Sequence, residues 1–89
     1  MAAAQKILLE IVTPAETVFR GAVALVTVPA SEGEMGVMAH HAPLITALDE
    51  GDLKIYDEDN GVVSKTHRIS GGFVDISDNK CTVLAEKLL

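Results

Sequence analysis

Apolar residues recur at every second position in short stretches of this chain, which is the pattern of β-strands with one buried face. In Phe73–Ser77, Val74 and Ile76 share one face while Asp75 takes the other. No stretch of about a dozen residues shows the 3.6-residue period of an amphipathic helix. The stretches expected to form strands are Lys6–Val12, Ala24–Pro29, Leu44–Leu48, Leu53–Tyr56, Thr66–Ile69, Phe73–Ser77 and Cys81–Ala85.

Turn-forming residues separate these stretches at short intervals. Asn60-Gly61 favours a primed two-residue turn, which would join Leu53–Asp57 to Val62–Ile69 as a hairpin. Ser77–Lys80 is expected to link the last two strands in the same way. These signals predict an all-β fold, a two-layer β-sandwich or flattened barrel of about eight to ten short, mostly antiparallel strands.

The sequence shows neither a linker nor an internal repeat. We therefore expect residues 1–89 to form a single domain. Ser70–Gly72 lacks the lysine and the following helix of a phosphate-binding loop, so a bulge or a close crossing of strands is the better interpretation.

Charge and composition exclude several classes of partner. The net charge is −6 and the isoelectric point is about 4.8, whereas nucleic acids and anionic membranes are bound by clustered Lys and Arg. Three aromatic residues and no Trp leave little to stack on bases or sugars. An acidic surface suits basic protein partners instead.

The single cysteine, Cys81, excludes an internal disulfide framework and is expected to be a buried, inert thiol within a strand. The chain also contains no apolar stretch long enough for a signal peptide or a membrane span. We expect a soluble protein of the cytoplasm without direct membrane insertion.

Ala30–Ile45 differs from the rest because it gathers carboxylates, glycines, two histidines and a proline. Carboxylate and imidazole groups bind zinc or iron, so a small metal-dependent β-barrel enzyme is one interpretation of this segment. Neighbouring residues of an extended segment point to opposite sides, however, so the two histidines would need a kink to share one ion. The candidate metal ligands would be Glu32, Glu34, His40 and His41.

Catalysis without a metal is less well supported. No serine of the chain lies in a nucleophile-elbow pattern, and a glycine-flanked loop offers Glu32 and Glu34 no apolar wall to raise a carboxyl pKa. A contact surface fits better, because Gly33 and Gly36 allow a tight exposed loop and the carboxylates offer charge-assisted bonds to Arg or Lys. A free-standing β-sandwich adaptor is therefore a further alternative.

Three motifs occur in a fixed order: "SEGEMGV…HHAPLITAL", "GDLKI" and "RISGGFVDISDNKCTVLAE". From about Ile7 to Glu86 they resemble the N-terminal domain of the ε subunit of F-type ATP synthases. The resemblance implies a β-sandwich of about ten strands. It also implies a non-catalytic rotor subunit of the central stalk, which joins the γ subunit to the membrane-embedded c-ring and couples ion-driven rotation to ATP synthesis.

The same resemblance implies a peripheral position at the cytoplasmic face of a bacterial inner membrane, with no cofactor, metal, bound nucleotide, nucleic acid or small-molecule substrate. It assigns contact with the c-ring to an acidic segment, in which Glu34 is the first candidate partner for basic groups. His41 and Thr46 would lie at an edge against γ and the ring. The c-ring contacts would be Ser31, Glu32, Gly33 and Glu34.

Two features depart from the family pattern. His40 stands where most relatives have Gly or Asn before His-Ala-Pro. The chain ends at Leu89, where most relatives continue into a C-terminal helical hairpin that carries the inhibitory function and, in some members, an ATP-binding motif. Neither property is therefore expected of this chain.

Overall fold

The computed structural model describes residues 5–89, which form nine β-strands. The strands are β1 (Ile7–Val12), β2 (Thr17–Val23), β3 (Leu25–Ala30), β4 (Gly33–Met38), β5 (Leu44–Leu48), β6 (Gly51–Tyr56), β7 (Lys65–Ile69), β8 (Gly72–Ser77) and β9 (Lys80–Ala85). Within this range no helix is long and apolar enough to cross a membrane.

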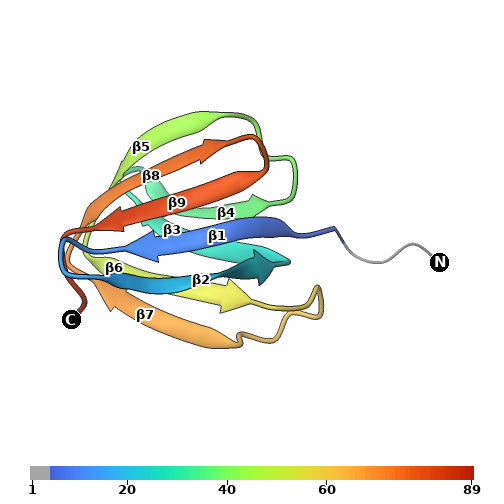
Figure 1. Cartoon of the computed structure of the whole chain (residues 1–89), viewed down its shortest axis with the longest axis horizontal. Helices are drawn as coiled ribbons and strands as arrows, with labels where there is room; N and C mark the ends of the chain where they lie inside the picture. The colour runs from blue at the N-terminus through green and yellow to red at the C-terminus, as the bar shows by residue number, and fades with distance from the viewer. Residues whose placement is uncertain (1–4) are drawn as a thin grey trace.

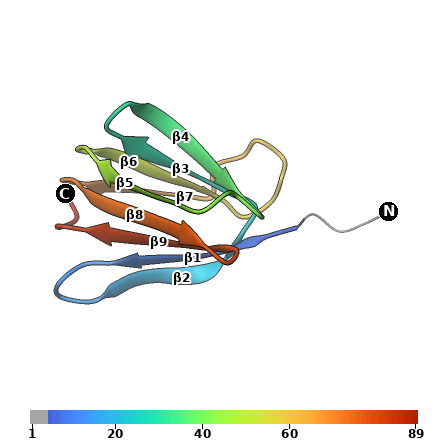
Figure 2. The ribbon, with the colours of Figure 1, turned by 90° about the horizontal axis from the view of Figure 1, so that it is seen from above.

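The strands are arranged in two layers, as Figures 1 and 2 show. One layer has the order β2-β1-β9-β8-β5 and the other β4-β3-β6-β7, with β5 and β3 joined at the pair Ala30 and Leu48. Neighbouring strands are antiparallel except for β1 and β9, which are parallel. The predicted two-layer sandwich of mostly antiparallel strands is confirmed.

The two layers are connected by a long hairpin that bends over from one to the other. The hairpin comprises β5–β6 and β7–β8, and its bend lies where Leu48 pairs with Gly72 and Gly51 pairs with Ile69. Gly72 has a φ of 148°, and a Cβ atom at this position would overlap the carbonyl oxygen of Leu84. Only glycine fits this close approach between the backbones of β8 and β9. Of the two predicted alternatives for Ser70–Gly72, a bulge or a close crossing, the contact at Gly72 favours the close approach of strands.

Inward-facing aliphatic side chains from both layers fill the core. Strand β1 alternates between buried and half-buried positions along its whole length, as a strand with one face on the core does. Cys81 is fully buried, which confirms the prediction, and burial raises the pKa of its thiol to about 12. The largest fully buried side chains are Ile7, Leu9, Ile11, Leu53, Ile55, Ile69 and Ile76.

One predicted turn is wrong and another is confirmed. Between β6 and β7, residues 57–64 form an irregular connection in which Gly61 has a positive φ of 74° and Asn60 does not. Asn60-Gly61 is therefore not a primed turn, and the following strand begins at Lys65 rather than at Val62. Between β8 and β9, Asp78 and Asn79 have φ values of 50° and 57°, which is the primed geometry expected for a two-residue hairpin loop.

Candidate functional site

The acidic segment forms the exposed tip of a β-hairpin, where the sequence predicts a tight exposed loop at Gly33 and Gly36, although Gly36 lies within β4. Strands β3 and β4 pair along their full length, closing at Ala30 and Gly33, so Ser31 and Glu32 alone form the turn. Gly33 has a φ of 128°, a conformation that residues with a side chain rarely adopt. Glu34 already belongs to β4.

Ser31 fixes this tip against the bend between β5 and β6. Its backbone N–H donates to the carbonyl oxygen of Ala47 at 3.2 Å. Its Oγ donates to Oδ1 of Asp49, also at 3.2 Å. The hairpin tip therefore has one defined position relative to both layers of the sandwich.

The two carboxylates of the segment are exposed. Glu34 lies 3.8 Å from the Nζ atom of Lys54, and both side chains are open to solvent, so this ion pair is weak. Glu32 makes no ion pair with any side chain between residues 5 and 89. Both carboxylates therefore remain available to a basic partner.

Thr46 lies close to the acidic tip across a groove between β4 and β5. The groove has a volume of about 280 Å³. The structure thus brings Glu32, Gly33 and Glu34 together with Thr46, although the sequence places them on different segments. The groove is lined by Ala30, Glu32, Gly33, Glu34, Met35, Leu44 and Thr46.

His41 lies elsewhere, in the turn that follows β4. The strand between Glu34 and this turn spans about 13 Å at the usual rise per residue. The Nδ1 atom of His41 lies 2.7 Å from the carbonyl oxygen of Ala42, its neighbour in the chain. His41 therefore does not share the groove with Thr46.

The same separation removes support from the metal-enzyme alternative. Glu32 and Glu34 are at one end of β4, whereas His40 and His41 are at the other. Across the described residues 5–89 no three His, Cys, Asp or Glu side chains are grouped so as to hold a metal ion. The four candidate ligands cannot converge on one ion without refolding the hairpin.

His40 adopts a φ of 64°, in the left-handed region that Gly and Asn favour. The residue before His41-Ala42-Pro43 thus has the backbone conformation that Gly or Asn would adopt at lower cost. The turn between β4 and β5 therefore forms with His40 at this position, although a residue with a Cβ atom pays a conformational cost there.

An exposed apolar face that was not predicted from the sequence lies on the outer side of the layer that contains β5, β8 and β9. Phe73 and Leu84 form a cross-strand pair and are 55% and 50% exposed, and Ile45 of β5 is 70% exposed. Val12 pairs with Leu84 on the other side, and Ala47 pairs with Phe73. The sequence did contain a sign of this face, because strand alternation places Phe73 on the same outward face as Asp75.

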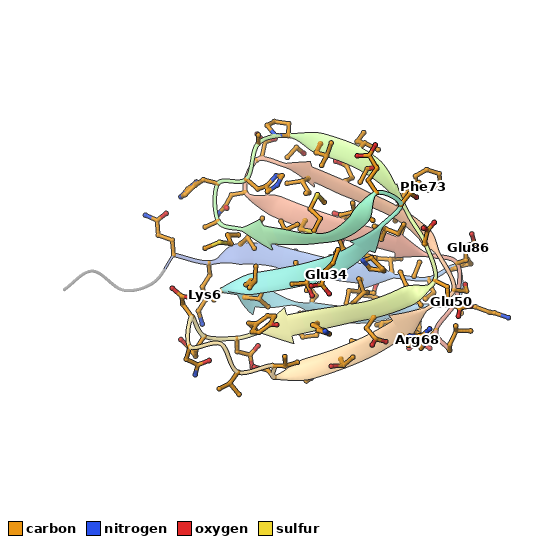
Figure 3. All side chains as sticks on the ribbon, turned by 180° about the vertical axis from the view of Figure 1, so that it is seen from behind. Lys6, Glu34, Glu50, Arg68, Phe73 and Glu86 are labelled. Carbon is orange, nitrogen blue, oxygen red and sulfur yellow. The ribbon has the colours of Figure 1, made fainter. Side chains whose placement is uncertain are left out.

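A groove of about 350 Å³ lies beside this apolar face, with Val12, Pro14, Phe73 and Leu84 in its lining. Figure 3 shows Phe73 near the same end of the molecule as Glu50, Arg68 and Glu86. Exposed apolar side chains that lie next to one another on a protein surface often mark a contact site for another protein. The face is a second candidate contact surface.

Acidic side chains gather at the end of the sandwich where the β3–β4 tip lies. Arg68 is held there by Asp52 at 3.1 Å and Glu50 at 3.3 Å, and these hydrogen bonds raise the pKa of its guanidinium. The carboxylates near this end outnumber the basic side chains, so the end carries a net negative charge. We call this region the acidic end; besides Glu50 it comprises Glu16, Glu32, Asp49 and Glu86.

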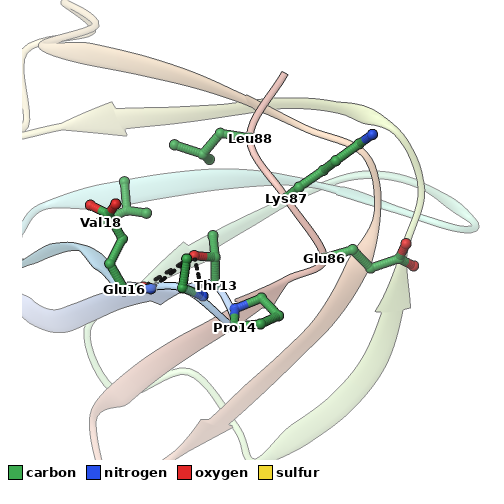
Figure 4. A pocket seen from close by; sticks show the side chains of 8 residues that line it. Thr13, Pro14, Glu16, Val18, Glu86, Lys87 and Leu88 are labelled. Carbon is green, nitrogen blue, oxygen red and sulfur yellow. Dashed lines mark hydrogen bonds between the residues drawn. The ribbon is translucent and has the colours of Figure 1, made fainter.

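A further pocket at this end, of about 320 Å³, lies between the β1–β2 turn and the C-terminal residues (Figure 4). Thr13 organises the turn, because its Oγ1 accepts hydrogen bonds from the backbone N–H groups of Ala15 at 3.3 Å and Glu16 at 3.2 Å. Val18 and Leu88 supply apolar walls. Thr13 acts here as a turn-forming residue.

The fold and these surfaces define a small all-β protein whose candidate sites are contact surfaces for other proteins. Residues 6–89 match the family model described as ATP synthase, Delta/Epsilon chain, beta-sandwich domain. The chain belongs to this family.

Individual relatives agree with this assignment. The chain is 42% identical over 79 residues to the ATP synthase epsilon chain of Granulibacter bethesdensis, covering 89% of this chain and 57% of the relative. It is 40% identical over 81 residues to that of Caulobacter vibrioides, covering 91% of each. The chain thus spans little more than half of one relative and most of the other.

The fold also matches a solved structure. The cryo-EM structure of the Euglena gracilis mitochondrial ATP synthase, described as OSCP/F1/c-ring in rotational state 1, contains a chain that superimposes with a TM-score of 0.83. The sequence identity is 26%, and the match covers 100% of this chain and 56% of that one.

Proposed function

We propose that this chain is a non-catalytic rotor subunit of the central stalk of an F-type ATP synthase, at the cytoplasmic face of a bacterial inner membrane. It links the γ subunit to the c-ring and couples ion-driven rotation to ATP synthesis. The observation that carries the proposal is the acidic β3–β4 tip, held at a fixed position on a domain of the ATP synthase Delta/Epsilon family.

The tip supports contact with the c-ring. Glu32 and Glu34 are exposed and lack strong internal partners, so basic groups on the polar loops of a ring can pair with them. Exposed pairs of this kind set register and association rate more than affinity. The proposed c-ring contacts are Ser31, Glu32, Gly33 and Glu34.

The apolar face supports a second, more permanent contact with γ. Phe73, Leu84 and Ile45 expose side chains that a tightly packed protein partner would bury. His41 and Thr46 remain proposed contacts at the edge between γ and the ring. Two modest contacts on one rigid domain reinforce each other once the complex is assembled.

The construction suits the transmission of torque. The bent hairpin of β5–β6 and β7–β8 contributes strands to both layers, so the layers cannot slide past one another without breaking backbone hydrogen bonds. A load applied at the β3–β4 tip is carried into the β5–β6 bend through Ser31.

Affinity purification of the tagged chain from solubilised membranes tests the proposal. We expect recovery of γ and the c-ring in the same complex. A free-standing adaptor would instead recover a stable partner outside the synthase, and that result would overturn the assignment.

A further inference from the structure

Strand β4 has one edge without a partner strand. Among residues 5–89 it pairs with β3 alone, along all six of its residues. Strand β5, across the groove, pairs with β8 and meets β3 only through Leu48. The groove therefore lies between two strand edges that are not hydrogen-bonded to each other.

The backbone of β4 points pairing groups into this groove. The two-residue turn is closed by Ala30 and Gly33, which are therefore a hydrogen-bonded pair. Hydrogen-bonded and non-hydrogen-bonded pairs alternate along antiparallel strands, so the backbone N–H and C=O groups of Glu34 and Gly36 point away from β3. The next residue of the series, Met38, shows the same direction, because its carbonyl oxygen accepts the N–H of His41 at 3.2 Å. Glu34 and Gly36 thus present one repeat of a vacant strand ladder.

The glycines leave room for another backbone to approach this edge. A Cβ atom at Gly33 would meet no atom within 4 Å. One at Gly36 would meet only the Cδ1 atom of Leu25, at 3.4 Å. Glycine within a strand often marks a place where a second backbone comes close.

The side chains around the groove define what would fill it. Met35 and Leu44 offer apolar surface inside the groove, whereas Glu32 and Glu34 place negative charge at its rim. An added strand alternates its side chains between two faces. A segment with apolar residues on one face and Lys or Arg on the other complements both sets.

We infer that the edge of β4 receives an extended segment of another rotor subunit, which adds a strand to the sheet by backbone pairing with Glu34 and Gly36. Its apolar side chains cover Met35 and Leu44, and its basic side chains pair with Glu32 and Glu34. Strand addition gives affinity through the backbone and specificity through the alternating side chains. The inference rests on the proposed function, since it specifies how the tip is bound.

Amide hydrogen exchange on the wild-type chain, free and in complex with purified γ and c-ring, tests it without any substitution. We expect the amides of Glu34 and Gly36 to exchange fast in the free chain and at least about tenfold more slowly in the complex. If the complex forms and these amides remain unprotected, strand addition is wrong while the proposed function stands. If neither γ nor the ring binds, the proposed function fails and the inference falls with it.

A matched pair of variants supplies an independent readout. Gly36→Pro removes an N–H that faces the groove, not β3, and places its ring on the edge, where proline is tolerated in strands. We expect it to weaken binding to the γ–c-ring assembly about tenfold or more, and Gly36→Ala to change binding less than about threefold. Equal binding by both variants, with an unchanged free fold by circular dichroism, would contradict the inference.

Discussion

The side chain of Asn79 accepts a hydrogen bond through Oδ1 from the backbone N–H of His40, at 2.8 Å. Its Nδ2 donates to the carbonyl oxygen of Lys6 at 3.0 Å. One side chain in the β8–β9 turn therefore joins the β4–β5 turn to the residue that precedes β1. This link holds His40 in its left-handed conformation and fixes the end of the sandwich opposite the acidic tip.

His40→Gly should stabilise the fold slightly. The left-handed conformation costs a residue with a Cβ more than it costs glycine, while glycine loses more backbone entropy on folding. The net gain in the free energy of unfolding should be about 0.5 kcal/mol. Urea titration measures it, with His41→Gly as the control that should lose stability. A loss of stability in His40→Gly would show that the imidazole makes a contact that outweighs the strain.

Gly72→Ala should destabilise the fold strongly. The new methyl group would overlap the carbonyl oxygen of Leu84, and the φ of 148° disfavours any residue with a Cβ. We expect a loss of about 3 kcal/mol or more in the free energy of unfolding. Gly21→Ala is the control, since its Cβ would lie 3.4 Å from the Phe19 ring without backbone strain. Urea unfolding measures the loss, and similar urea midpoints for the two variants would show that the backbones at Gly72 and Leu84 can move apart at little cost.

Stability should fall in alkaline solution partly through Cys81. Burial, with a smaller contribution from the charge of Asp75, raises the pKa of this thiol from 9.0 to about 12. As the pH rises, the Cys81 thiol therefore ionises in the unfolded chain before it does so in the folded chain. Its contribution to the free energy of unfolding is complete below pH 9 and is lost as the pH rises towards 12. The loss should approach about 1.4 kcal/mol per pH unit within that window.

Urea unfolding of the wild type and of Cys81→Ala at about pH 8 and about pH 10.5 isolates this contribution, because other groups titrate in both proteins. The variant should lose less stability between the two values. An equal loss in the free energy of unfolding for the wild type and Cys81→Ala would mean that the thiol is exposed to solvent in the folded chain.

Phe73→Ser should impair binding more than folding. The side chain is 55% exposed, so its removal should change the free energy of unfolding by less than about 1 kcal/mol. Binding to isolated γ, measured by calorimetry, should weaken about tenfold or more, as for an anchor residue at the centre of an interface. Thr82→Ser on the same face provides a mild control. Unchanged affinity would place γ on another surface.

Glu34→Ala should weaken attachment to the c-ring only modestly. Exposed ion pairs contribute little, so we expect a loss of about 0.2–1 kcal/mol, which should shrink further at high salt. Sedimentation of the chain with ring-containing vesicles over a salt series measures this. Complete loss of the assembled complex from this single change would show that Glu34 has a larger role than a rim contact.

The sequence predicted the strands in which buried aliphatic residues recur at every second position, such as β1 and β8, because this recurrence records burial directly. It missed β2 and β4. Arg20 and Gly21 interrupt the alternation of β2, an edge strand with a register shift opposite it, and Gly33 and Gly36 gave β4 the composition of a loop. Edge strands carry less burial and therefore a weaker pattern.

The candidate site shows the same limit. Proximity of Thr46 to Glu32 depends on the bend between β5 and β6, a tertiary feature with no local signature. Turn composition also has limited predictive value here. Asn-Gly is the more typical sequence of a primed hairpin turn, yet Asp78-Asn79 adopts the primed conformation and Asn60-Gly61 does not. The eight-residue connection around Asn60 lets Ser64 bond to Ile55 and Asp57, so no tight turn is required there.

Whether this chain physically joins γ to the c-ring can be measured by co-sedimentation. Vesicles that contain purified c-ring are sedimented with purified γ, with and without the chain, and the γ subunit in the pellet is quantified. We expect γ to sediment in stoichiometric amounts only when the chain is present. The same amount of γ in both pellets, with the chain left in the supernatant, would contradict it.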